Sequence, residues 1–201
     1  MHPTTELCTR KVISFNCISF SSVGDPACGS GNFLTETYIS LRRLENKALS
    51  EIHQGQIMFG GEGELDPIKV GIGQFYGIEI NDFAVTVAKT ALWIAESQML
   101  HETEEIVNRS LDFLPLKSYA NITKENALRI DWKDVVPVEK LSYIMGNPPF
   151  VGANNVSKEQ KAELFDLFGD KSKAGLLDYV AGWYIKATNY ISDTDICVCQ
   201  V

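Results

Sequence analysis

The feature that most constrains the fold is a glycine-rich turn, Asp25-Pro26-Ala27-Cys28-Gly29-Ser30-Gly31-Asn32-Phe33-Leu34. A strand is expected to end just before it, near Gly24, and residues 32–49 carry apolar side chains at helical spacing. The two glycines of the turn allow a tight strand-to-helix connection whose backbone can approach a ligand closely. The pattern therefore predicts a strand, a binding loop and a helix, which is a unit of α/β folds.

Strands and helices continue to alternate after this unit. Residues 74–80 have a short strand pattern that ends at an acidic residue, and Asn81 or Asp82 can cap a helix over residues 83–100. The next strands are expected at residues 122–128 and 141–145, and the last at residues 196–201. This alternation predicts an open, mostly parallel sheet with helices on both faces, whose ligands bind at the carboxyl ends of the strands.

Two further helices and one loop complete the expected arrangement. Ser157 and Gln160 make a capping box for a helix that runs through Phe168. A second helix, rich in aromatic residues, is expected over residues 174–191. Residues 52–73 are rich in glycine and proline and are expected to form a loop or insertion.

Composition narrows the functional classes. With 201 residues, 45% of them hydrophobic, the chain is long enough for one globular domain with a sizeable core. The net charge of -8 argues against strong nucleic-acid binding by this chain alone, because phosphate contacts require a basic surface. Five cysteines without a CxxC pair signal neither a disulfide scaffold nor a metal site, and the start of the chain lacks a signal-peptide pattern. We expect a cytoplasmic protein.

The first candidate site is a cofactor site at the ends of the early strands. Asp25 could hold an ammonium group or an ordered water, and Glu79 could accept hydrogen bonds from two ribose hydroxyls. Asn126 and Ala127 could offer an amide and a backbone N–H to a purine edge, although such a segment is a plain turn at least as often. Cys28 is expected to fill space within the turn, since no histidine partner lies nearby in the sequence.

The second candidate site is an acceptor loop, Asn147-Pro148-Pro149-Phe150, at the end of an apolar run. The side-chain oxygen of Asn147 and the carbonyl of Pro148 could accept both protons of an amino group and free its lone pair for attack on an electrophilic methyl group. Phe150 supplies a face for stacking, worth roughly 1 to 3 kcal/mol per base. The alternative, at about even odds for the loop in isolation, is a rigid turn with Phe150 buried in the core.

Together these segments resemble the S-adenosylmethionine-dependent DNA adenine-N6 methyltransferases. Within that group, residues 77–81, 126–132 and 146–152 are similar to the methyltransferase domain of the MmeI-like, type IIG restriction-modification enzymes. The resemblance implies a Rossmann-like fold that binds S-adenosyl-L-methionine. The implied cofactor-binding residues are Asp25, Pro26, Ala27, Cys28, Gly29, Gly31, Asn32, Phe33, Glu79, Ile80, Asn126 and Ala127, and the implied catalytic residues are Asn147, Pro148, Pro149 and Phe150.

The resemblance also implies a partner and a domain plan. Double-stranded DNA would present a flipped adenine, held mainly by a target-recognition domain that follows the catalytic part. Residues 23–201 are then expected to form a partial catalytic domain that stops inside the fifth strand, without the later strands and the recognition domain, and residues 1–22 a segment of unassigned structure. Other acceptors stay open, namely cytosine N4, an RNA guanine or a protein glutamine, as does an inactive fragment.

Overall fold

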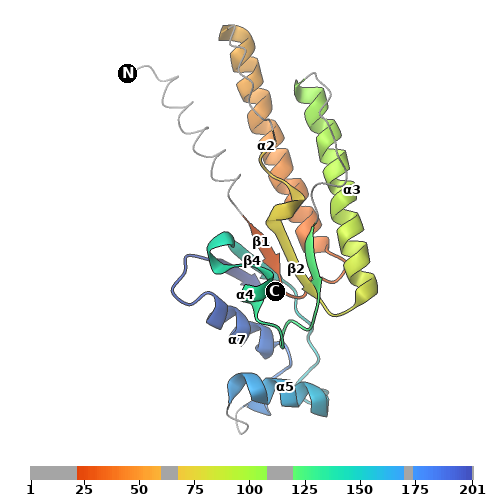
Figure 1. The fold of residues 1–201 in the computed structure, drawn as a ribbon, viewed down its shortest axis with the longest axis vertical. Coiled ribbons are helices and arrows are strands. Elements are labelled where there is room, and N and C mark those ends of the chain that lie inside the picture. Colours follow the sequence, from red (N-terminus) through yellow and green to blue (C-terminus); the bar gives the residue numbers. More distant parts are fainter. Residues whose placement is uncertain (1–21, 60–67, 108–119, 170–173, 201) are drawn as a thin grey trace.

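The chain folds into an α/β domain in the computed structural model, which describes residues 22–59, 68–107, 120–169 and 174–200 (Figure 1). The strands are β1 (Val23–Asp25), β2 (Phe75–Glu79), β3 (Asn121–Lys124), β4 (Tyr143–Gly146) and β5 (Cys197–Gln200). The helices are α2 (Asn32–Phe59), α3 (Asp82–Val107), α4 (Trp132–Val135), α5 (Lys158–Phe168) and α7 (Ala181–Tyr190), and short 3-10 helices, η1 (Ile72–Gln74) and η2 (Val138–Lys140), precede β2 and β4.

The five strands form one parallel sheet in the order β3-β2-β1-β4-β5. The chain moves outward from β1 to β3, then returns to place β4 on the other side of β1, with Gly24 opposite Ile144. Such a reversal opens a crevice at the carboxyl ends of the two central strands, where ligands bind in folds of this kind. The expected open parallel sheet and its Rossmann-like order are therefore confirmed.

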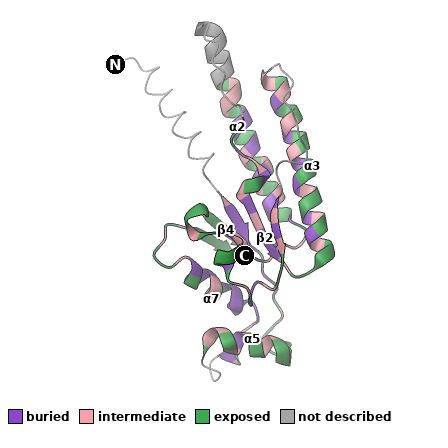
Figure 2. Ribbon diagram, in the orientation of Figure 1, coloured by how far each residue is buried: buried purple, intermediate pink, exposed green. Residues whose placement is uncertain are grey.

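Helices cover both faces of the sheet. On one face, Leu34 and Tyr38 of α2 and Leu92 of α3 pack on Val23 and Phe75. The opposite face has its own core, in which aromatic and aliphatic side chains from α4, α5 and α7 meet Ile78 and Ile144: Trp132, Leu164, Trp183 and Tyr190. Figure 2 shows the central strands as largely buried and the outer sides of the helices as exposed.

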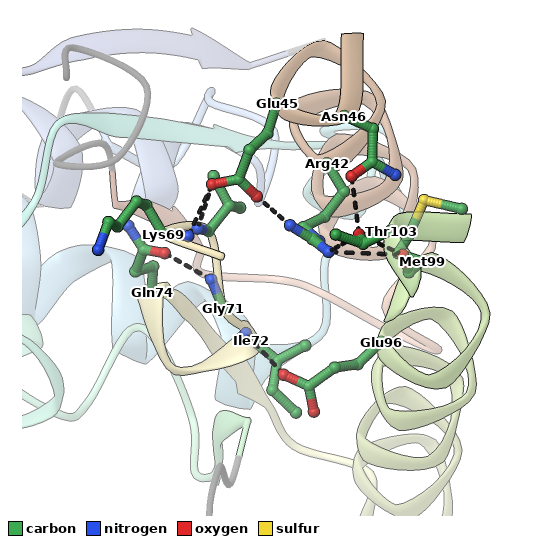
Figure 3. Close-up of polar contacts among 11 residues, drawn as sticks. Arg42, Glu45, Asn46, Lys69, Gly71, Ile72, Gln74, Glu96, Met99 and Thr103 are labelled. Carbon is green, nitrogen blue, oxygen red and sulfur yellow. Dashed lines mark hydrogen bonds and ion pairs between the residues drawn. The ribbon is translucent and has the colours of Figure 1, made fainter. Parts of the chain in front are cut away.

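A buried polar cluster joins α2, α3 and the segment that leads into β2 (Figure 3). Arg42 forms an ion pair with Glu45, and its Nη2 donates to Thr103 Oγ1 at 2.6 Å. Thr103 in turn donates to Asn46 Oδ1 at 2.7 Å, while Glu45 Oε1 accepts the N–H of Lys69 at 2.7 Å. Because buried charges are costly unless paired, this cluster fixes how the two long helices meet.

Several predicted boundaries are confirmed. Strand β2 ends at Glu79, and the Asn81 side chain accepts the N–H groups of Phe83 and Ala84, as expected of a helix cap. The capping box of Ser157 and Gln160 is present at the start of α5. Within the described residues, none of the helices is long and apolar enough to cross a membrane.

Other predicted boundaries are wrong. Helix α3, expected to end near residue 100, continues to Val107. The loop was expected to span residues 52–73, but α2 continues to Phe59 and η1 begins at Ile72. The helix tolerates its internal Gly55 because a single glycine costs a helix only about 1 kcal/mol. Strand β3 ends at Lys124, since the next residues turn around the Asn126 side chain. Helix α7 begins at Ala181 rather than near residue 174. Residues 1–21 lie outside the described residues.

Candidate active site

One cleft of about 460 Å³ lies at the carboxyl ends of the strands and brings the two predicted sites together. The loop after β1 contributes Pro26 and Ala27 to its wall, and the end of β2 contributes Glu79. The loop after β4 contributes Asn147 and Pro149. The other predicted residues that line this cleft are Ile80, Asn126 and Ala127. Residues far apart in the sequence thus share a space large enough for a nucleotide-sized ligand.

The carboxylate of Glu79 is held in a fixed position. Its Oε2 accepts the N–H of Gly29 at 3.0 Å, and its Oε1 accepts the N–H of Asn81 at 2.8 Å. A carboxylate has about four acceptor positions, so two remain for other donors. Glu79 therefore ties the glycine-rich loop to the start of α3 and can still accept hydrogen bonds from a pair of hydroxyl groups.

The glycine-rich loop packs tightly on its neighbours. Gly31 has φ +82°, and a Cβ at this position would lie 2.9 Å from Cβ of Ala88 in α3. The N–H of Cys28 donates to the carbonyl of Ile78 at 3.2 Å, and burial raises the pKa of the Cys28 thiol to about 12. Cys28 is thus buried and fills space beneath the loop. Asn32 and Phe33, at the start of α2, are exposed.

Asp25 is a buried carboxyl group at the end of β1, and it is not among the residues that line the cleft. Its Oδ1 accepts the N–H of Ala27 at 2.9 Å, while its Oδ2 has no hydrogen-bond partner among the described residues. Burial raises the pKa of Asp25 to about 7; the Ala27 N–H opposes this rise, and the charge of Glu79 adds to it. A buried carboxylate oxygen without a hydrogen-bond partner among the described residues is suited to a positively charged group.

The end of β4 lies directly against Asp25. A Cβ at Gly146 would be 2.5 Å from Asp25 Oδ1, so only glycine fits between this carboxyl and the acceptor loop. The next residues alternate in exposure, with Asn147 and Pro149 exposed and Pro148 buried. Phe150 is 63% exposed, which argues against the alternative that its ring is buried in the core.

Two aromatic residues also line the cleft, and no pattern in the sequence predicts a role for them there. Trp183 of α7 lines the cleft, and its indole N–H donates to the carbonyl of Pro26 at 3.0 Å. Tyr179 also lines it, with its ring edge-on to that of Trp183 at a centroid distance of 5.3 Å. Their spacing of four residues was a signal for one helical face, but it is equally typical of core packing.

Asn126 is engaged in the wall of the cleft. Its Oδ1 accepts the N–H of Leu128 at 2.9 Å, and its Nδ2 donates to Glu163 Oε1 at 3.0 Å. Glu163, on α5, also accepts hydrogen bonds from Arg129 Nε at 2.7 Å and from the hydroxyl of Tyr179. These bonds occupy the side-chain amide of Asn126, which was expected to be available to a purine edge. No group of His, Cys, Asp and Glu side chains suited to a metal ion occurs in the described part of the chain.

A parallel sheet of this order, with a glycine-rich loop after its first strand and an amide-bearing loop after its fourth opening onto one cleft, is typical of Rossmann-like methyltransferases, and the fold and the cleft place the chain in that class. Comparison with known proteins then specifies the family. Residues 12–201 match the MmeI DNA-methyltransferase domain, and the chain belongs to that family.

The relatives and a solved structure agree with this assignment. The chain is 41% identical over 180 residues to DNA methyltransferase A of Bacillus subtilis (strain 168), covering 88% of this chain and 20% of that protein. It is 27% identical over 173 residues to a putative type II restriction enzyme and methyltransferase of Methanocaldococcus jannaschii, covering 80% of this chain and 14% of that protein. The structure of the type IIL restriction-modification enzyme MmeI in complex with DNA superposes with a TM-score of 0.84 at 39% identity, covering 94% of this chain and 25% of the other.

Proposed function

We propose that the domain transfers a methyl group from S-adenosyl-L-methionine to the N6 amino group of adenine in DNA, as part of a restriction-modification system. The observation that carries the proposal is the single cleft that joins Glu79 and the loop after β1 to Asn147. One side of this cleft offers Glu79 as an acceptor for ribose hydroxyls, with the loop that carries Asp25 beside it, and the other side offers Asn147 as an acceptor for an amino group. The MmeI structure solved with DNA supports DNA as the substrate class.

The cofactor half fits S-adenosyl-L-methionine, which supplies an electrophilic methyl group on a sulfonium centre when it is bound. Glu79 would accept the ribose hydroxyls at its remaining acceptor positions. Asp25 is buried, and its Oδ2 has no hydrogen-bond partner in the part of the chain that the structure describes; this carboxylate would hold the ammonium group of the methionine moiety. Ala127 and Ile80 would border the purine ring.

The acceptor half polarises the target nitrogen. The Asn147 side-chain oxygen and the Pro148 carbonyl would each accept one amino proton, which draws the nitrogen toward a tetrahedral geometry and directs its lone pair at the methyl group. Positive charge develops on this nitrogen during transfer, and fixed acceptors stabilise it. Phe150, exposed beside the loop, would stack on the base once it has left the duplex.

The test is methyl transfer by the full-length protein and its Asn147→Ala variant. Labelled S-adenosylmethionine is supplied with unmethylated DNA, and the hydrolysed DNA is analysed for N6-methyladenine and N4-methylcytosine. We expect N6-methyladenine from the wild type and a loss of roughly 100-fold or more in Asn147→Ala. Asn154→Ala is the matched control, because Asn154 is an exposed asparagine that follows the same loop.

Three results would contradict the proposal in different ways. Unchanged transfer by Asn147→Ala would exclude the acceptor role of the loop. N4-methylcytosine as the product would move the reaction to another base. Preference for RNA or protein over DNA, in a competition among these three acceptors, would replace the substrate class while leaving the methyltransferase chemistry in place.

A further inference from the structure

Asp178 binds the acceptor loop from a distant part of the chain. Its Oδ2 accepts the N–H of Gly152 at 2.7 Å, and its Oδ1 accepts the N–H of Val151 at 3.1 Å. These two residues directly follow Phe150, the last residue of the Asn-Pro-Pro-Phe loop. One carboxylate thus fixes two successive backbone N–H groups, an arrangement that holds a loop in one conformation.

The Asp178 carboxylate makes its two shorter hydrogen bonds to the loop and only a longer one beside its own helix. Asp178 also lies near the start of α7, where its Oδ1 is 3.4 Å from the N–H of Val180. That contact is the longest of the three, and the two shorter bonds both cross to the loop. The same hydrogen bonds lower the pKa of Asp178, with the bond from Val151 as the main cause, so the group stays ionised at neutral pH.

The segment that carries Asp178 also binds the cofactor half of the cleft. Next to it, Tyr179 lines the cleft and bonds to Glu163. One turn further along, Trp183 donates its indole N–H to the carbonyl of Pro26, in the loop after β1. A short stretch of chain is therefore hydrogen-bonded to the loop after β1 at one end and to the loop after β4 at the other.

We propose that Asp178 is a positioning residue for methyl transfer, which sets the Asn147–Phe150 loop at its working distance from the cofactor side of the cleft. This inference rests on the proposed function. Asp178 does not line the cleft, so it acts through the loop and not on the reacting atoms. Because a displacement of about 1 Å in a reacting group can cost about 100-fold in rate, release of the loop should slow transfer far more than it weakens cofactor binding.

The informative change is Asp178→Asn. Asparagine keeps the size of the side chain but offers one oxygen where two are used, so one loop N–H would face an NH₂ donor. We expect kcat to fall 10- to 100-fold, the dissociation constant for S-adenosylhomocysteine to stay within about 2-fold, and amide hydrogen exchange at Val151 and Gly152 to accelerate. Asp166→Asn, an exposed aspartate on α5, is the matched control and should change none of these quantities.

Loss of a helix cap would not explain such a result, because asparagine and serine cap helices about as well as aspartate. Asp178→Ser is therefore the second variant, and it replaces Asp178→Asn in the test if the latter does not fold. The inference is overturned if kcat is unchanged in either folded variant, or if kcat and cofactor affinity fall together with the melting temperature. Absence of methyl transfer by the wild type would instead refute the proposed function. Even then, unchanged amide hydrogen exchange at Val151 and Gly152 in the variant would refute the role of Asp178 in holding the loop.

Discussion

Replacing Asp25 by asparagine tests whether the cleft was built around a buried negative charge. The Asp25 side chain is 2% exposed, and its pKa is raised from 3.8 to about 7, mainly by burial. In the unfolded chain the same carboxyl ionises near 3.8. The folded state therefore binds this proton more tightly than the unfolded chain does. The resulting contribution to the free energy of unfolding is fully present below pH 3.8 and is lost as the pH rises through 7.

The size of this effect follows from the two pKa values. At about 1.4 kcal/mol per pKa unit, the difference between 3.8 and about 7 makes burial of the ionised Asp25 cost about 4 kcal/mol above pH 8. Between pH 5 and pH 8 about 3 kcal/mol of this cost develops, because the unfolded carboxyl is already ionised there while the folded one stays protonated until the pH approaches 7. Asparagine keeps the shape without the charge, and any cost from its buried NH₂ group is the same at both pH values.

Urea denaturation of the ligand-free wild type and Asp25→Asn at pH 5 and pH 8 measures this difference. The variant should gain about 3 kcal/mol relative to the wild type on going from pH 5 to pH 8. Asp166→Asn, with an exposed carboxyl, should show no such gain. The reasoning is refuted if the stability difference between the wild type and Asp25→Asn is the same at both pH values.

Cofactor binding should show the opposite preference. If only the ionised Asp25 holds an ammonium group, the apparent affinity of the wild type for S-adenosylhomocysteine should weaken about tenfold from pH 8 to pH 6, because the ionised fraction falls by that factor. Asp25→Asn should bind more weakly and without this dependence. Calorimetric titration at the two pH values measures these affinities. A wild-type affinity that does not depend on pH would show that the Asp25 charge does not contribute to cofactor binding.

Two further substitutions probe the frame of the site. Gly146→Ala would place a methyl group 2.5 Å from Asp25 Oδ1. It should lower the free energy of unfolding by about 1 to 3 kcal/mol and weaken S-adenosylhomocysteine binding. Unchanged stability and binding would show that the close approach of Gly146 to Asp25 is not required. Arg42→Ala would leave the buried Glu45 without its ion-pair partner and should lower the free energy of unfolding by about 3 to 5 kcal/mol in urea denaturation. Cofactor affinity should change little at a temperature where the variant is folded. A loss of stability below about 1 kcal/mol would contradict the assigned role of the ion pair.

The parts of the site that local sequence could predict are those that depend on a strand ending and a helix beginning. Glu79 is an example, because the period-2 pattern before it and the Asn81 cap after it both act within a few residues. The glycine-rich loop is another, since its backbone requirement is visible in the residues themselves. Once the strands are parallel, their carboxyl ends must share one edge, so the meeting of Glu79 and Asn147 in one cleft follows from fold class.

The remaining parts depend on contacts that no local pattern encodes. Trp183 reaches Pro26 across a sequence separation of 157 residues, and its position on α7 would suit any core-facing aromatic residue. Asp178 is separated from Gly152 by 26 residues and lies inside the helix expected over residues 174–191, where no local pattern indicates a bond to a distant loop. The sequence predicts a later end for β3 for a related reason. The Asn126 side chain accepts the N–H of Leu128 and forms a turn where the strand is expected to continue.

The contact between Asp25 and Gly146 shows why the two halves of the site need each other. The two residues end neighbouring strands, β1 and β4, whose pairing is fixed over Gly24 and Ile144. A side chain at position 146 would collide with the Asp25 carboxyl, and a slip of β4 by one residue would replace that glycine by Met145 or Asn147. The strand register that places the Asn147–Phe150 loop is therefore the same register that leaves room for the buried Asp25 carboxyl, so the pairing of β1 and β4 sets the positions of both.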